Sequence, residues 1–434
     1  MFQIILLVVF GALAVVGVLI FSFAIGGGTS NAVGAIKIWG TLEGSAFTAV
    51  IRQASDNNPQ LSGVSYQQRD QTTYEADLTQ ALASGTGPDL FLLRQDYALK
   101  DASKVALIPS SALSPAQFKS TFIDAASPFL TSTGVIAVPI LADPLVLYWN
   151  KDMLASAGFA QPPKYWDEFF NIAQKITKKD DSGTIRKSAV AMGEYANVDN
   201  AKDVLATLIM QAGGTITAED SAGHLVAAVQ PRIGGAAQST VSALRFFTEF
   251  ADPSKNDYSW NRSLPSAQKA FSAGDLALYV GYASEEATIA RANSNLNFAP
   301  APLPQIRSAS NSLGTARVYA LAAPRAGKNP NGAITAAFLI VTKANAQAHS
   351  TALGIPSARR DVLNGVANGV NADAQTNDAL FARMVIIAHS WLDPDPDKTN
   401  DLFRVMIENT TSGALLVTEA VQRADQQMSQ ILGL

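Results

Sequence analysis

The chain of 434 residues contains no cysteine. This absence excludes disulfide bonds, thiolate catalysis, cysteine-ligated zinc and a lipid-modified cysteine near the N-terminus. Histidine is almost as scarce, because only His224, His349 and His389 are present and no two of them are spaced as a metal-binding pair. The sequence therefore predicts no metal site and no other cofactor.

The charge of the chain is mildly acidic, and the common catalytic motifs are missing. A net charge of −4 with no run of basic residues gives no electrostatic basis for a nucleic-acid partner. The patterns G-x-S-x-G, H-E-x-x-H and G-x-x-x-x-G-K-[ST] do not occur. These gaps argue against an enzyme, although a glycosidase whose two carboxylates meet only in space stays open as an alternative.

One long apolar run stands near the N-terminus. Between Ile4 and Ile25, Ser22 is the only side chain that is neither apolar nor glycine. At about 1.5 Å per residue such a run spans roughly 30 Å, which is enough to cross a bilayer. Because no basic residue precedes it and no A-x-A site follows it, we favour a retained single-pass anchor at residues 1–25 over a cleaved signal peptide. Residues 26–34 then form a flexible tether to a domain on the extracytoplasmic side of the cell membrane.

From residue 35 onward, strand-like and helix-like segments alternate, which predicts an α/β fold, and the length suggests two lobes. Aromatic residues make up only 8% of the chain. Trp39 and Tyr282 nevertheless fall at strand ends, where open α/β sheets bind ligands, so both a ligand site and a core position stay open for them. We expect Trp149 to lie in the core and the patch Asp393–Asp397 to form a solvated loop.

Several motifs then occur in a fixed order. Residues 138–154 read V-P-I-L-A-D-P-L-V-L-Y-W-N-K-D-M-L, followed by A-G at 157–158 and P-P-K-Y-W-D-E-F at 162–169. Further matching stretches lie at 82–91, 270–278, 301–304 and 354–360. Together they resemble the extracellular solute-binding proteins of family 1, which are the sugar-type binding proteins of ABC importers.

This resemblance implies a two-lobed α/β fold of the periplasmic-binding-protein type II, with crossover strands at a hinge. By the family pattern, residues 35–140 and 301–353 form lobe 1, and residues 141–300 and 354–434 form lobe 2. Strand ends and matches to the family together predict the following ligand contacts: Trp39, Glu43, Arg69, Asp143, Asn197, Asn200, Tyr282, Arg317 and Trp391.

The expected function is binding without chemistry. We expect a monomer that binds a sugar or a similar small solute and delivers it to the membrane subunits of an ABC importer by lobe closure. A ligand-sensing module or a membrane-anchored glycan-active enzyme on the same fold remain the alternatives.

Overall fold

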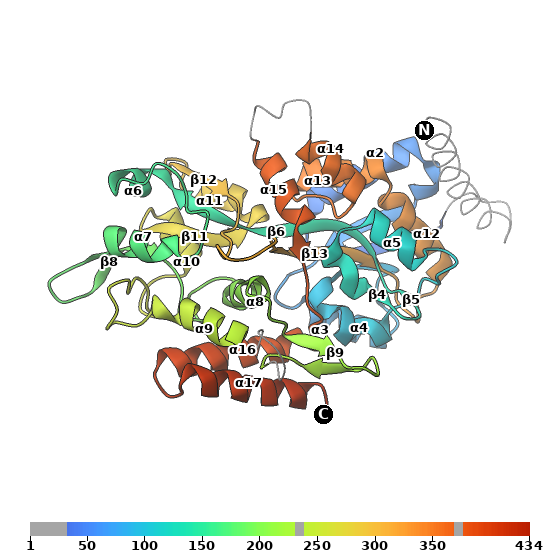
Figure 1. Ribbon diagram of the computed structural model, residues 1–434. Coiled ribbons are helices and arrows are strands. Elements are labelled where there is room, and N and C mark those ends of the chain that lie inside the picture. The colour runs from blue at the N-terminus through green and yellow to red at the C-terminus, as the bar shows by residue number, and fades with distance from the viewer. Residues whose placement is uncertain (1–32, 231–237, 369–375) are drawn as a thin grey trace, which may run out of the picture.

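The computed structural model describes residues 33–230, 238–368 and 376–434. Within these ranges the chain forms a mixed α/β structure in which one strand, β6, runs across the middle of the molecule and joins its two sides (Figure 1). The hydrogen-bonded strand order is β2 (Val64–Gln68), β1 (Ile36–Gly40), β3 (Leu90–Arg94), β13 (Gly314–Ala322), β6 (Val138–Asn150), β11 (Leu276–Tyr282), β8 (Ile185–Val190) and β7 (Lys178–Lys179).

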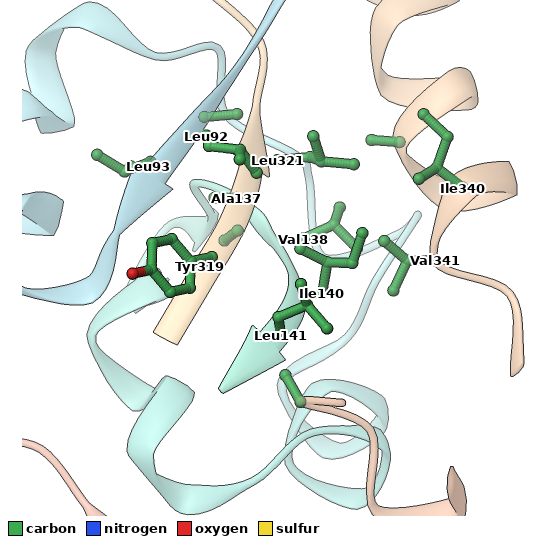
Figure 2. Packing of buried hydrophobic residues seen from close by; sticks show 14 of the residues in the cluster. Leu92, Leu93, Ala137, Val138, Ile140, Leu141, Tyr319, Leu321, Ile340 and Val341 are labelled. Atoms are coloured by element: carbon green, nitrogen blue, oxygen red, sulfur yellow. The ribbon is translucent and has the colours of Figure 1, made fainter. Parts of the chain in front are cut away.

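The first hydrophobic core forms around β1, β3, β13 and the first half of β6, and we call this part lobe 1. Strand β3 reads L-F-L-L-R, the continuous apolar run of a strand that is covered on both faces. Strand β1 pairs in parallel with β2 and β3, with helices α2 (Gly44–Asn57) and α3 (Tyr74–Ala83) as the connections. Figure 2 shows Leu92, Ile140, Leu321 and Ile340 of this core packing together from separate elements.

A second hydrophobic core forms around β8, β11 and the second half of β6, and we call this part lobe 2. Strand β11 pairs in parallel with β8 and antiparallel with β6. Large side chains such as Phe247 and Phe403 fill the space between the strands and the helices. The helices of this lobe are α7 (Glu168–Ile176), α8 (Ala201–Gln211), α9 (Ser239–Glu249), α10 (Ala267–Ser272), α16 (Pro396–Thr411) and α17 (Val417–Ile431).

Strand β6 passes from one core to the other. Its residues up to Ala142 pack in lobe 1, and its residues from Leu145 onward pack in lobe 2. The first half pairs with β13, where Arg317 stands opposite Asp143, and the second half pairs with β11 and with β12 (Phe298–Ala301). Asp143 and Pro144 therefore lie where the chain crosses between the lobes, which places them beside any cleft between the two cores.

The exact lobe boundaries that the sequence predicts stay a proposal. Leu303 packs in lobe 2 and Ala316 in lobe 1, so the chain returns between them. Ile355, Ala358 and Leu363 still pack in lobe 1, which favours a last crossing later in the chain than residue 354.

The remaining helices and short strands complete the two lobes and their connections. They are α4 (Ala98–Asp101), α5 (Pro115–Thr121), α6 (Lys151–Ser156), α11 (Glu286–Ala292), α12 (Pro330–Ile340), α13 (Lys343–Leu353), α14 (Arg360–Ala367), α15 (Asn377–Ile386), β4 (Leu130–Thr131), β5 (Gly134–Val135), β9 (Thr217–Glu219), β10 (Leu225–Ala227) and β14 (Ala388–His389).

The described part of the chain contains no helix long and apolar enough to cross a bilayer. The anchor that we predicted at residues 1–25 lies outside the described residues, as does the tether up to residue 32.

Candidate ligand-binding site

A small cavity lies where elements of both lobes meet. Gln95 and Asp96 follow the end of β3, and Thr315 and Ala316 come from β13, so these residues form the lobe 1 side. The cavity encloses about 40 Å³. A volume of this size holds a few water molecules, so a larger ligand requires the lobes or side chains to move. The other lining residues are Lys202, Asp203, Ala206, Tyr282, His389, Ser390, Trp391 and Asp393.

Arg317 of β13 reaches from the crossover region to the first turn of α8. Its Nη2 donates to Asn200 Oδ1 at 3.2 Å and to Asp203 Oδ2 at 3.0 Å. The guanidinium carbon also lies 3.8 Å from the centre of the Tyr282 ring. Asn200 precedes α8 in the left-handed conformation, with φ of 63°, which turns its side chain toward Arg317 and Glu285. Three of the predicted contact residues, Asn200, Tyr282 and Arg317, therefore meet at one point.

Asp143 lies beside this point and is 1% exposed. Its Oδ1 accepts a hydrogen bond from the Ser284 backbone N–H at 3.0 Å, and its Oδ2 accepts one from the Ser284 hydroxyl at 2.6 Å. Burial raises the pKa of Asp143 to about 6, although the bonds from Ser284 and the charge of Arg317 oppose this rise. The carboxyl of Asp143 thus fixes the turn after β11 to the crossover strand.

Glu285 organises the lobe 2 side of the same region. Its carboxylate accepts hydrogen bonds from Asn200 Nδ2 at 3.2 Å, Gln268 Nε2 at 2.6 Å and the Tyr279 hydroxyl at 2.5 Å. The backbone N–H of Tyr282 donates to it at 2.9 Å. Because four donors converge on one carboxylate, Glu285 holds both Asn200 and the end of β11 in place.

Trp391, another predicted contact residue, lines the cavity beside a buried ion pair. Lys202 Nζ contacts Asp393 Oδ2 at 2.7 Å and Thr399 Oγ1 at 2.7 Å, and it lies 5.5 Å from the centre of the Trp391 ring. Burial raises the pKa of Asp393 to about 6, and Lys202 opposes the rise. The prediction of a solvated loop is wrong for Asp393, which is 2% exposed, because tertiary contact with Lys202 draws the start of the patch inward.

A second set of polar contacts joins the two lobes next to the cavity. The Tyr97 hydroxyl donates to Asp397 Oδ1 at 3.1 Å, and Lys100 Nζ pairs with Asp395 Oδ1 at 3.1 Å and with Asp397. Tyr97 and Lys100 belong to lobe 1, around α4, whereas Asp395 and Asp397 begin α16 of lobe 2. We call this group the α4–α16 contact.

Arg94 and Asp96 form an ion pair on the lobe 1 side, with Arg94 Nε 2.9 Å from Asp96 Oδ1. Burial raises the pKa of Asp96, but the charge and hydrogen bonds of Arg94, together with the charges of Lys202 and Arg317, outweigh burial, so the pKa lies below its ordinary value. Asp96 is therefore charged in the cavity wall at neutral pH.

Trp39, near the carboxyl end of β1, and Arg69, just after β2, lie together but do not line the cavity. The guanidinium carbon of Arg69 stands 3.5 Å above the centre of the Trp39 ring. Trp39 is 6% exposed, and its Nε1, like Arg69 Nε, has no hydrogen-bond partner within the described residues. Arg69 therefore covers the Trp39 ring, and the role of the two residues as ligand contacts stays a prediction.

Glu43 and Asn197 lie away from the cavity. The exposed Glu43 carboxylate caps α2 by accepting from the backbone N–H groups of Ser45 and Ala46, which lowers its pKa. Asn197 is 8% exposed and donates to two backbone carbonyls at 2.9 Å each, while its Oδ1 accepts from Trp260 Nε1 at 3.1 Å. Their polar groups are used inside each lobe, and neither side chain lines the cavity.

Sequence reasoning missed several residues of the site. Gln95 and Asp96 directly follow β3, so the strand-end rule that selected Trp39 could also have selected them. Lys202 and Asp203 carry no comparable signal, because only the tertiary packing of α8 brings them to the cavity. Glu285 lies in the turn after β11 and reaches the region through its bond from Asn200.

No group of three or more acidic or histidine side chains that could hold a metal ion occurs within residues 33–230, 238–368 and 376–434. The acids around the cavity are instead paired with Arg94, Lys202 and Arg317, or bonded to neutral donors. The arrangement can therefore orient a polar ligand through many donors and acceptors, with rings available for its apolar faces.

Two α/β lobes that share a polar, aromatic cavity at their crossover strands suit a protein that binds a small solute between them. The chain belongs to the bacterial extracellular solute-binding protein family, whose model matches residues 39–346. Members of this family are binding proteins, so the chain is not an enzyme.

Solved structures with the same fold cover most of the chain. The GacH receptor of Streptomyces glaucescens has a TM-score of 0.69 at 18% identity, over 92% of this chain and 98% of that one. The cyclic alpha-maltosyl-1,6-maltose binding protein of Arthrobacter globiformis has a TM-score of 0.72 at 17% identity, over 92% and 98%. The maltotriose binding protein of Thermus thermophilus has a TM-score of 0.66 at 18% identity, over 92% and 100%. Similarity at these identities establishes the fold.

Curated relatives match over a shorter stretch. A binding protein of Brucella abortus and one of Brucella suis are each 30% identical to this chain over 100 residues, which is 23% of this chain and 24% of theirs. The match thus spans about a quarter of the length of these relatives.

Proposed function

We propose that the protein binds a carbohydrate in the cavity between its lobes and delivers it to an ABC importer by lobe closure. One observation carries this proposal: the aromatic rings of Tyr282 and Trp391 line the same cavity as Asp203. Arg317 joins them there, because it contacts Tyr282, Asn200 and Asp203. A sugar has apolar C–H faces that pack on aromatic rings, and hydroxyls that need fixed donors and acceptors.

The ligands of structural relatives support the proposal. The GacH receptor was solved in complex with acarbose, and the Thermus thermophilus protein was solved with maltotriose. An ABC transporter solute-binding protein of Thermotoga lettingae, solved with alpha-D-tagatose, shares the fold at a TM-score of 0.66 and 21% identity. These relatives favour a carbohydrate ligand and an importer as the partner.

Lobe closure is supported by the crossover geometry and the contacts between lobes. Asp143 lies at the crossing of β6, and the α4–α16 contact lies beside the cavity. A ligand that touches both lobes binds the closed form better than the open form and so shifts the population toward it. The membrane subunits of an importer would then distinguish the loaded protein by its shape.

The extracytoplasmic location follows from the family, whereas attachment to the membrane is our proposal. The apolar run from Ile4 to Ile25 supports a retained single-pass anchor. A sensing role on the same fold would use the same cavity, with a receptor in place of the importer as the partner.

A thermal-shift screen of the purified full-length protein tests the proposal. The panel contains mono- and oligosaccharides, with amino acids and inorganic phosphate as non-carbohydrate controls. A ligand at about 100 times its Kd stabilises the folded state by about 2.7 kcal/mol, which is a clear rise in Tm. The proposal fails if no carbohydrate raises the Tm while one of the control solutes does.

A further inference from the structure

Arg317 of β13 covers one face of the Tyr282 ring at the end of β11. The guanidinium carbon is 3.8 Å from the ring centre, which is stacking contact and leaves no room for another group on that face. The same guanidinium uses Nη2 to donate to both Asn200 Oδ1 and Asp203 Oδ2, at 3.2 Å and 3.0 Å. One side chain thus covers an aromatic face and two acceptors that together resemble a sugar-binding surface.

We infer that Arg317 is an internal competitor for the ligand of this cavity, and that the ligand must displace it from Tyr282, Asn200 and Asp203. The inference rests on the proposed function, and it names Arg317 as the residue that sets which ligands the cavity selects. The cavity volume of about 40 Å³ agrees with this reading, because a sugar ring is several times larger. Arg317 and Asp203 both reach solvent, since their side chains are 25% and 34% exposed. Buried Asp143, which stands opposite Arg317, keeps its two hydrogen bonds from Ser284 when Arg317 leaves.

The groups that Arg317 releases define the class of ligand that can replace it. Asn200 Oδ1 and Asp203 Oδ2 are both acceptors, so the ligand must donate hydrogen bonds to them while an apolar face covers Tyr282. Asp143 stands opposite Arg317 on β6, and Glu285 binds Asn200, so further negative charge surrounds the place. A neutral pyranose with adjacent hydroxyls meets these conditions, whereas a sugar acid places a carboxylate beside Asp203.

Arg317→Met tests the inference against Arg307→Met as the matched control. Arg307 stacks on Tyr165 at 4.0 Å and pairs with Asp167 at 3.0 Å, but it lies on lobe 2 outside the cavity. Maltose, maltotriose and maltotetraose serve as neutral probes in calorimetry, with tri-galacturonic acid as the anionic probe. Because removal of a competitor raises apparent affinity, Arg317→Met should bind the best neutral probe at least about threefold more tightly than wild type, and Arg307→Met should not.

Weaker or unchanged binding of the neutral probes by Arg317→Met overturns the inference. Weaker binding would make Arg317 a ligand contact, and unchanged binding would mean that Arg317 does not affect the ligand. Preferred binding of tri-galacturonic acid by wild type overturns it as well. Either result leaves carbohydrate binding itself intact, so failure of this inference can be distinguished from failure of the proposed function.

Chemical rescue decides the inference if neither protein binds any of the four sugars, a result that counts against the proposed function. Arg317→Ala opens the place that the guanidinium fills on Tyr282. Methylguanidinium should then raise the Tm of Arg317→Ala but not that of wild type. An equal response of the two proteins shows that the vacated place on Tyr282 accepts no external ligand and overturns the inference.

Discussion

The α4–α16 contact predicts how strongly the lobes are held together. Lys100 Nζ approaches carboxylates of both Asp395 and Asp397 across the two lobes, and the side chain of Lys100 is 28% exposed. The side chain of Asp395 is 17% exposed and that of Asp397 is 61% exposed, so one ion pair is partly shielded from solvent and the other is screened. An exposed pair contributes about 0.5 kcal/mol and a partly shielded one about 1 kcal/mol, so we expect Lys100→Met to destabilise the closed form by about 1.5 kcal/mol.

This change corresponds to roughly a tenfold shift in the equilibrium between open and closed forms. When the closed form is the minor one before binding, the apparent Kd rises by the same factor. Calorimetry at about 20 mM NaCl should show the full effect, and at about 1 M NaCl the wild type should approach Lys100→Met because salt screens the pair. Small-angle scattering at one ligand concentration near the wild-type Kd should show a larger radius of gyration for the variant than for wild type.

Lys187→Met is the control for this experiment. Lys187 pairs with Asp275 at 2.6 Å within lobe 2, so its loss removes an ion pair without separating the lobes. If Lys100→Met binds ligand like wild type at low salt, or if Lys187→Met weakens binding equally, the α4–α16 contact does not govern closure.

Three further predictions concern buried polar groups. Asn197→Ala removes three buried hydrogen bonds, so urea unfolding should show a loss of about 3 kcal/mol while ligand affinity stays unchanged; a large loss of affinity in the folded variant would contradict this. Burial raises the pKa of Asp143 to about 6, so the stability that it contributes is full below about pH 4 and is lost as the pH rises through 6, by about 3 kcal/mol. Asp143→Asn should flatten that part of the pH profile in urea unfolding, and an unaltered profile would refute the assignment. His349 is fully buried and has no hydrogen-bond partner among the residues that the structure describes, and burial lowers its pKa to about 4. Its stability contribution is therefore full above about pH 6.5 and is lost as the pH falls toward 4. The stability of His349→Leu relative to wild type should therefore rise by about 2 kcal/mol between about pH 7.5 and pH 5, and a difference that does not change with pH would contradict this.

Local sequence signals located part of the site. Tyr282 ends β11, and Asp143 lies in the motif that crosses between lobes, so the strand-end rule and the family pattern both pointed to the cavity region. Arg317 was selected because it lies near the start of a strand, and the structure places it on Tyr282. The fold was likewise predictable, since continuous apolar strands such as Leu90–Arg94 and the ordered motifs constrain it strongly.

The rest of the site depends on partners that are distant in the sequence. Lys202 and Asp393 are 191 positions apart in the sequence, and Asp393 stands in a patch whose composition is typical of solvent-exposed loops. Asn197 is polar and follows a strand, as a ligand residue would, but Trp260 and two backbone carbonyls take up its amide. A polar residue that binds ligand and one that satisfies a buried backbone look alike until their tertiary partners are known.

Calorimetric titration of wild type and Trp391→Ala with the strongest carbohydrate from the thermal-shift screen tests carbohydrate binding in the inter-lobe cavity most directly. Trp391 lines the cavity and is only half-buried, so its removal should leave both hydrophobic cores intact. The proposal predicts saturable binding of one ligand per wild-type chain, and a Kd at least about tenfold higher for Trp391→Ala because the stacking surface is lost. Equal affinity of the two proteins would show that the ligand binds elsewhere and would contradict the proposal.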